Sequence, residues 1–149
     1  IFTMTIKERL SADLKTAMKE NDIFRRDTIR LINAGIKQVE VDKRVVLDDE
    51  GVIKILLGAK KQRLDSIAAY ESAKRDDLVV KEKGELEIIL QYLPKQLSDD
   101  ELRRKIKEII DALGASGTQD LGKVMGACKD LQSVADGAKI AKIAKELLG

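Results

Sequence analysis

Apolar residues recur along the chain at intervals of three and four positions, the spacing that places side chains on one face of an α-helix. No segment alternates apolar and polar residues with the period of two that is typical of a half-buried strand. The composition agrees with this pattern, because the many Ala, Leu, Lys and Glu residues all favour helices. The sequence therefore predicts an all-α fold.

Four helices are predicted before residue 93. Thr5-Ile6-Lys7-Glu8 fits a capping box, in which a hydroxyl and a carboxylate bind free backbone amides at a helix start. Asn21-Asp22 ends the first helix, Asp48-Asp49-Glu50-Gly51 opens the third, and the fourth begins near Asp76. The side chains expected to be buried are Ile6, Leu10, Leu14 and Met18; Ile29, Ile32, Ile36 and Val39; Ile53, Leu56, Leu57, Leu64, Ile67 and Ala68; and Leu78, Leu86, Ile89, Leu90 and Leu93.

A boundary is expected after the fourth helix. Pro94 is the only proline and disfavours helical geometry at Leu93, and Ser98-Asp99-Asp100-Glu101 forms a second capping box. We predict an N-terminal helical bundle over residues 4–93 and a three-helix domain over residues 98–149. Residues 1–3 precede Met4, the expected natural start, and are expected to be foreign to the native chain. The buried side chains expected in the second domain are Leu102, Ile106, Ile109, Ile110 and Leu113; Leu121, Val124, Met125, Cys128 and Leu131; and Ile140, Ile143, Ala144 and Leu147.

The residue types that are missing exclude several classes of protein. The sequence has no histidine, which excludes an imidazole base, a Ser-His-Asp triad and any histidine-bearing metal site. Cys128 is the only cysteine, so neither an internal disulfide nor a cysteine-cluster zinc site is possible. We therefore expect no metal and no cofactor. No apolar run is long enough for a membrane span and no signal-peptide pattern is present, so we expect no membrane partner and a cytoplasmic localisation.

One segment partly matches a phosphate-binding P-loop. Gly117 to Lys123 fit the first seven positions, but the eighth is Val124, where magnesium binding requires Ser or Thr. A P-loop also follows a strand, whereas a helix is predicted here, and we expect close helix packing to explain Gly122. Carboxylates that could act as acid and base lie instead at predicted helix starts, where they cap free amides. No catalytic residue is predicted.

The basic residues gather in runs that leave two interpretations open. Solvated helix faces commonly carry such runs. The alternative is a surface that contacts phosphates, whose binding is electrostatic and sensitive to salt. Acids are scarce near the last of these runs, because Asp130 and Asp136 are the only ones between positions 123 and 145. The runs are Arg25, Arg26 and Arg30; Lys60, Lys61 and Arg63; and Lys123, Lys129, Lys139, Lys142 and Lys145.

A set of short motifs also follows a fixed order along residues 4–149. The motifs are Lys61-Gln62-Arg63-Leu64-Asp65-Ser66-Ile67 with Tyr70, Ala73 and Asp77-Leu78; Glu85-Leu86-Glu87-Ile88-Ile89-Leu90 with Tyr92-Leu93-Pro94-Lys95-Gln96-Leu97; and Gly114-Ala115, Gly122-Lys123-Val124-Met125 and Ala135-Asp136-Gly137. The ordered set resembles the YqeY family. That family is similar in its C-terminal part to the tail of GatB, the B subunit of the Glu-tRNA(Gln)/Asp-tRNA(Asn) amidotransferase.

This resemblance implies a helical bundle followed by a three-helix tail. It also implies an association with tRNA, because the tail of the amidotransferase contacts the tRNA body. Families of this kind are often labelled carbon–nitrogen ligases with glutamine as amido donor. The amidotransferase performs that chemistry in a separate catalytic domain and a partner amidase, and this chain is too short to include either.

We therefore expect a tRNA-associated helper without its own catalytic centre. Lys123, Lys129, Lys139 and Lys142 are expected to contact phosphates, and the amides at the start of the last helix, around Gly137, are expected to bind one as well. Two alternatives stay open. One is a protein–protein adaptor that docks a partner through its N-terminal bundle, and the other is an accessory part of a glutamine-dependent ligase complex. The sequence does not specify an oligomeric state.

Overall fold

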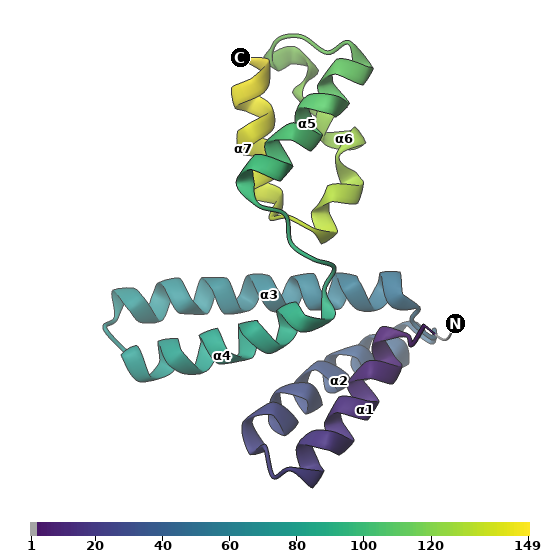
Figure 1. Ribbon diagram of the computed structural model, residues 1–149, viewed down its shortest axis with the longest axis vertical. Helices are drawn as coiled ribbons and strands as arrows, with labels where there is room; N and C mark the ends of the chain where they lie inside the picture. Colours follow the sequence, from purple (N-terminus) through teal and green to yellow (C-terminus); the bar gives the residue numbers. More distant parts are fainter. Residues whose placement is uncertain (1–2) are drawn as a thin grey trace. The chain divides into compact units, whose positions relative to one another are not determined.

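The computed structural model describes residues 3–149, and every regular element in that range is a helix (Figure 1). The predicted all-α fold is confirmed. Ile1 and Phe2, two of the three residues expected to be foreign to the native chain, lie outside the described residues. The elements are α1 (Ile6–Lys19), α2 (Ile23–Lys43), α3 (Asp49–Ser72), α4 (Asp76–Tyr92), α5 (Asp99–Leu113), the 3₁₀ segment η1 (Thr118–Asp120), α6 (Leu121–Ala127), the 3₁₀ segment η2 (Lys129–Ser133) and α7 (Gly137–Leu148).

The chain divides into two compact units, one that ends at Leu93 and one that spans Pro94–Gly149. Leu93 has a φ of −87° and a ψ of 155°, the extended conformation that a following proline favours. Helical geometry resumes only at α5, which Ser98 caps. Independent folding of the two units is a prediction.

Side-chain caps begin the helices where the sequence places them. Thr5 and Ser98 each form a complete capping box with the glutamate three positions later. The carboxylates of Asp22 and Asp48 accept hydrogen bonds from backbone amides in the first turns of α2 and α3, at 3.2 and 3.0 Å. Gly114 ends α5 with a φ of 63°, a left-handed conformation that glycine adopts without strain.

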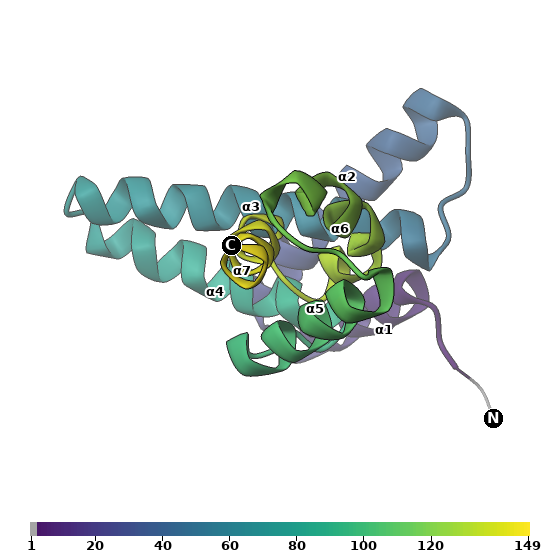
Figure 2. The ribbon, with the colours of Figure 1, turned by 90° about the horizontal axis from the view of Figure 1, so that it is seen from above.

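Two helical hairpins build the first unit. Helices α1 and α2 lie side by side (Figure 1), and so do α3 and α4 (Figures 1 and 2). All four helices contribute apolar side chains to one core, and burying each large side chain stabilises the fold by about 1.5–3 kcal/mol. The side chains with no exposed surface are Leu10, Ile29, Val52, Leu56 and Ile89.

Three of the predicted core positions are wrong, because Met18, Leu64 and Ala68 are exposed. Among the helices of the first unit, the outer half of α3 extends past α2 and lies beside α4 (Figures 1 and 2). A helix with a single neighbour buries only a narrow stripe, which here includes Ile67 and leaves Leu64 39% exposed. Met18 lies in the last turn of α1, where its sulfur contacts the Arg30 guanidinium at 4.0 Å.

A polar cluster joins the end of α4 to α1 and α2. The buried Tyr92 hydroxyl donates a hydrogen bond to the Asp13 carboxylate, and the Arg9 guanidinium lies 5.2 Å from the centre of the Tyr92 ring. Arg25 lies 3.7 Å from the same carboxylate and donates to the Gln91 side chain at 2.8 Å. Burial and the Asp13 carboxylate raise the pKa of Tyr92 to about 12.

A second polar contact joins α3 to α4. Arg63 Nε donates to Glu85 at 3.0 Å and lies 3.6 Å from Glu82. Glu85 is only 6% exposed, so its carboxylate requires this partner. The pair therefore fixes which turns of the two helices face each other.

The second unit packs α5, α6 and α7 around a core of its own. The chain entering α5 is held by the Leu97 amide, which donates to the Val134 carbonyl at 2.8 Å. The side chains with no exposed surface are Leu102, Ile106, Val124, Ile140 and Ala144.

Helix α6 is shorter than the sequence predicts. It ends at Ala127, and Leu131, which we expect on the same helix, lies in η2. The expectation that close packing explains Gly122 is also wrong, because a Cβ at this position would meet no atom within 4 Å. A half-buried side chain such as that of Leu131 can pack on the core from a 3₁₀ turn as well as from an α-helix. The spacing of apolar residues alone therefore does not determine where the α-helix ends.

Limited proteolysis tests the independence of the two units. We expect the first cleavage within residues 94–98, because this stretch has no helical hydrogen bonds to protect it. The C-terminal fragment should keep a helical circular dichroism spectrum and a cooperative thermal transition. First cleavage inside a helix, or an unfolded C-terminal fragment, would contradict the prediction.

Replacing Tyr92 by Phe tests the polar cluster. The substitution removes a buried hydrogen bond to a carboxylate, so we expect the free energy of unfolding to fall by about 2 kcal/mol at neutral pH. Urea titrations of both proteins measure this difference.

The same difference should depend on pH. The pKa of Tyr92 is about 12 in the folded chain and about 10 when unfolded, so the stabilisation is fully present below pH 10. Between pH 10 and 12 the unfolded state loses its proton first, and the advantage of the native protein over the Tyr92→Phe variant should shrink. A difference that stays constant over this range would show that the hydroxyl does not hold its proton as the geometry requires.

Candidate nucleic-acid interface

The lysines of α7 lie on the side of the helix that faces away from the core. Ile140, Ile143 and Ala144 are buried, and at 100° per residue Lys142 falls on the opposite side while Lys139 lies on the flank, about 100° from Ile140; both lysines are exposed. The two positions are 60° apart around the helix axis. They therefore share one face, as their spacing of three residues predicts.

Asp99, at the start of α5, approaches this face. Its carboxylate lies 2.8 Å from the Lys139 ammonium, and this contact lowers the pKa of Asp99 and raises that of Lys139. The charge of Lys142 adds to the lowering of the Asp99 pKa. The structure thus brings Lys139 and Lys142 together, and it gives Lys139 an internal partner that a phosphate has to displace.

The other two predicted lysines lie on different elements. Lys123 is on α6 and Lys129 is the first residue of η2, and both are exposed. Within residues 3–149, neither of them nor Lys142 forms an ion pair. The second unit therefore presents separate unpaired cations from three elements, and the structure does not gather them into one closed site.

Gly137 begins α7, where the sequence predicts a phosphate contact. The Asp136 carboxylate accepts a hydrogen bond from the Ala138 amide at 3.3 Å, so the first turn already holds an acceptor. A Cβ at Gly137 would meet no atom within 4 Å, which shows that the turn is open on that side. The phosphate contact at Gly137 stays a prediction. A phosphate would have to share this helix N-terminus with the Asp136 carboxylate, which already accepts one of its amide hydrogen bonds.

Two features of this surface are absent from the predicted phosphate contacts, although Lys145 belongs to the last of the basic runs in the sequence. Lys145 is exposed three positions after Lys142, so it extends the lysine face by one more turn. Gly126 is exposed four positions after Gly122, and together the two glycines leave one side of α6 without side chains. The spacing of three residues between Lys139, Lys142 and Lys145 would have placed Lys145 near the same face. Nothing in a single sequence distinguishes an exposed glycine from a packed one.

The structure shows the surroundings of the residues that could be considered for thiol, phosphate or metal chemistry. Cys128 is 1% exposed, and burial raises the pKa of its thiol, so the reactive thiolate is disfavoured. The segment that partly matches a P-loop follows α5, and the Asp120 carboxylate accepts a hydrogen bond from the Ser116 amide at 2.9 Å inside its loop. Across residues 3–149 no three Cys, Asp or Glu side chains lie close enough together to hold a metal ion.

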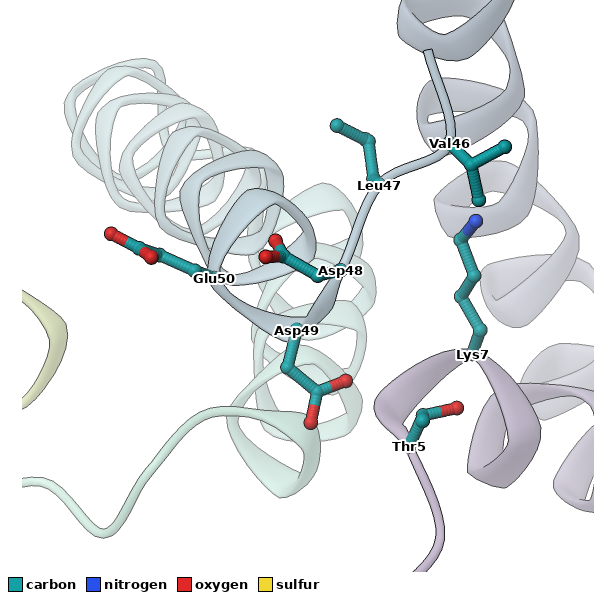
Figure 3. A pocket seen from close by; sticks show the side chains of 7 residues that line it. All are labelled: Thr5, Lys7, Val46, Leu47, Asp48, Asp49 and Glu50. Atoms are coloured by element: carbon teal, nitrogen blue, oxygen red, sulfur yellow. The ribbon is translucent and has the colours of Figure 1, made fainter.

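A cavity of about 440 Å³ lies where α1, α3 and the loop before α3 meet (Figure 3). In Figure 3 the Lys7 side chain points toward Val46 and that of Asp49 points toward Thr5. These polar groups are already engaged, since Lys7 pairs with Glu40 and Asp49 accepts a hydrogen bond from the first amide of α1 at 2.9 Å. The cavity is therefore a junction between helices, and its charges hold those helices together.

Comparison with known proteins places the chain in a family. Residues 7–148 match the family model described as Yqey-like protein. The chain belongs to the YqeY family. This YqeY protein is 36% identical over 107 residues to altered inheritance of mitochondria protein 41, mitochondrial, of Saccharomyces cerevisiae, an alignment that covers 70% of this chain and 58% of the yeast protein.

Relatives with the same name occur in two further fungi. The protein of Clavispora lusitaniae is 35% identical over 109 residues, with 72% of this chain and 64% of the relative covered. That of Pyrenophora tritici-repentis is 30% identical over 120 residues, with 79% and 66% covered. The YqeY chain thus spans less than two thirds of the length of the yeast relatives it matches.

The expected cytoplasmic localisation is contradicted by these comparisons. The matched relatives are named as mitochondrial proteins, with which a cytoplasmic expectation does not agree. Targeting signals are encoded separately from helix patterning and core packing, so the composition of the folded part does not reveal them. Among residues 3–149, no helix combines the length and the apolar character that crossing a membrane requires.

Proposed function

We propose that this YqeY protein is a tRNA-associated helper that binds RNA phosphates through its second unit and has no catalytic centre of its own. One observation carries the proposal: the second unit exposes lysines that form no ion pair within residues 3–149. They include Lys123, Lys129, Lys142 and Lys145 on α6, η2 and α7, and also Lys95, Lys105 and Lys107.

Unpaired surface cations are the groups that phosphates recruit, because binding releases the counterions condensed on the nucleic acid. Lys142 and Lys145 follow one another along the exposed side of α7 at a spacing of three residues. The similarity of the C-terminal part to the tail of GatB, which contacts the tRNA body, supports tRNA as the ligand.

The bare side of α6 supports the same proposal. Gly122 and Gly126 are exposed beside Lys123, and a Cβ at either glycine would meet no atom of the protein. Glycine inside a helix costs about 1 kcal/mol relative to alanine, and packing within this unit does not offset that cost. A surface without side chains allows a sugar–phosphate backbone to approach closely while Lys123 binds its charge.

The buried, unreactive thiol of Cys128 takes no part in this proposed binding role. As an accessory part of a glutamine-dependent carbon–nitrogen ligase complex, the protein would contribute RNA binding while another chain performs the chemistry. This alternative uses the same RNA-binding surface as the main proposal. It differs only in requiring a second protein chain, the catalytic one, in the same complex.

A second candidate function is a protein–protein adaptor, which the apolar surface of the first unit favours. The large apolar side chains that are exposed in residues 3–149 all belong to that unit. Phe24 lies against Gly84, where a Cβ would come within 3.0 Å of its ring, and Val80 lies one turn earlier on α4 and is 71% exposed. Ile23, at 59% exposed, extends this surface toward the start of α2.

Charge reversal at Lys123 and Lys142 tests the RNA proposal. We expect each substitution, Lys123→Glu and Lys142→Glu, to weaken binding of a tRNA transcript, and to weaken it similarly for RNAs of different sequence. The slope of log affinity against log salt should become shallower by about 0.7–0.9 for each phosphate that the variant no longer binds. Fluorescence anisotropy over a salt series measures both quantities.

The matched control is Lys15→Glu, which makes the same charge change at an exposed position on α1. It should leave the affinity and the salt slope nearly unchanged. Equal affinity and equal slope for the Lys123 and Lys142 variants would contradict the proposal and favour the adaptor.

Asp99→Asn provides a prediction of opposite sign. The substitution removes the partner of Lys139 and leaves that ammonium available to a phosphate, so we expect tighter tRNA binding and a steeper salt slope. Asp111→Asn removes the same charge from the far end of α5 and serves as the control. If both variants change binding equally, the effect belongs to net charge and Lys139 does not bind a phosphate.

A further inference from the structure

A groove with a volume of about 420 Å³ lies between α2 and α3, lined mainly by apolar residues and also by Gln62 and by Arg63, the partner of Glu85. Ile32 and Leu56 form its floor and are 5% and 0% exposed. The groove is open along its sides because glycine and alanine, which have little or no side chain, lie there. Gly35 lies where the helices cross, Gly58 lies farther out, and a Cβ at Gly58 would meet no atom within 4 Å.

The same face carries a side chain that such a groove accommodates. Leu31 lines the groove from α2 and is 55% exposed. A protruding leucine beside a hollow lined by small residues is the arrangement by which two helical surfaces interlock. Each copy of the face therefore offers both the projection and the hollow.

The two edges of the groove carry opposite charge. On α2, Asp27 and Asp42 lie on the same side of the helix as Leu31 and Gly35, at spacings of four, four and seven residues. Asp27 lies at the wide end of the groove, beyond Leu31, and Asp42 lies beyond the crossing. Both carboxylates are exposed. Asp27 forms an ion pair with its neighbour Arg26, which a partner's lysine has to compete with, and Asp42 accepts hydrogen bonds from the Gln38 amide and forms no ion pair within residues 3–149.

On α3, Lys54 and Lys61 flank Gly58 at spacings of four and three residues. Both are exposed and form no ion pair within residues 3–149. Lys54 and Lys61 lie about 10 Å apart along α3, within the span of about 22 Å that separates Asp27 from Asp42 along α2, so the middle of the α3 edge is basic where the α2 edge is acidic at both ends.

We propose that this face binds a second copy of the chain, with the two-fold axis lying along the groove. A rotation by 180° about that axis exchanges left and right, so α2 of each copy lies opposite α3 of the other. Asp27 of one copy then faces Lys61 of its partner, and Asp42 faces Lys54. Leu31 of each copy enters the hollow beside Gly58 of the other.

A second copy satisfies every feature of the face at once. It fills the hollow, covers the exposed leucine and pairs both charged edges twice. Two helices about 30 Å long and about 10 Å wide offer roughly 600 Å² per copy, which is near the lower limit for a specific interface. The expected dimer is accordingly weak and dissociates on dilution. Its test uses no RNA, so the result is independent of the proposed RNA binding.

Sedimentation equilibrium of the full chain over a wide concentration range measures the association. We expect a mass that rises with concentration from 16.6 kDa toward twice that value. Leu31→Asp should raise the dissociation constant at least about tenfold, because it buries a charge in the apolar hollow. Leu64→Asp makes the same change at an exposed leucine of α3 outside the groove and should leave the association unchanged.

Gly58→Leu separates association from folding. The substitution places a side chain in the hollow that Leu31 of the partner needs, so the dimer should be lost. Leucine favours a helix more than glycine does, and the site has open space, so the thermal midpoint should rise. Loss of the dimer in a variant that melts higher cannot come from misfolding.

A charge swap tests the orientation. Lys61→Glu and Asp27→Lys should each weaken the dimer, and the double variant should restore it toward the native affinity. A mass of 16.6 kDa at every concentration would overturn the proposal and leave the groove to a helix of another protein. A dimer that Leu31→Asp and Gly58→Leu leave intact would also overturn it, because association would then use another face.

Discussion

The last turn of α4 determines how the two hairpins of the first unit pack on each other. Ile89 and Tyr92 are buried there between helices, and the Tyr92 hydroxyl, the Gln91 amide group and the Gln91 carbonyl bind side chains from α1 and α2. Two hairpins that share only apolar contacts can pack in several registers. Directed hydrogen bonds from one turn to both neighbouring helices select one of them. The helix ends immediately afterwards at Leu93, so the element that orders the first unit also closes it.

The sequence predicts the helices well because their ends are encoded locally. Thr5, Asp22, Asp48 and Ser98 cap the helices that follow them, and each capping contact spans only three residues. Core positions are predicted less well, because burial depends on how many neighbours a helix has. Leu64 has the helical spacing expected of a buried residue. Within the first unit, however, the outer half of α3 packs on α4 through a neighbouring stripe that includes Ile67, and Leu64 stays exposed. The number of neighbours is a tertiary property that spacing does not contain.

The candidate RNA surface shows the same division. Exposure of Lys139 and Lys142 follows from the apolar positions of α7 alone. The contact between Lys139 and Asp99 joins residues 40 positions apart and required the packing of α5 on α7. The openness of Gly122 and Gly126 likewise depends on what does not pack against α6. Local chemistry was therefore predictable here, and the competition between internal and external partners was not.

The buried Arg63–Glu85 pair has a mechanical consequence for the long hairpin of α3 and α4. Apolar stripes alone allow two helices to slide past each other, since every turn offers a similar surface. One turn of sliding, about 5.4 Å, would leave the Glu85 carboxylate in an apolar contact without its guanidinium. Slippage is thus penalised while bending of the pair as a whole is not. The native register thus costs no unpaired carboxylate, and it is the register in which α3 and α4 deliver Leu56 and Ile89 to the same core.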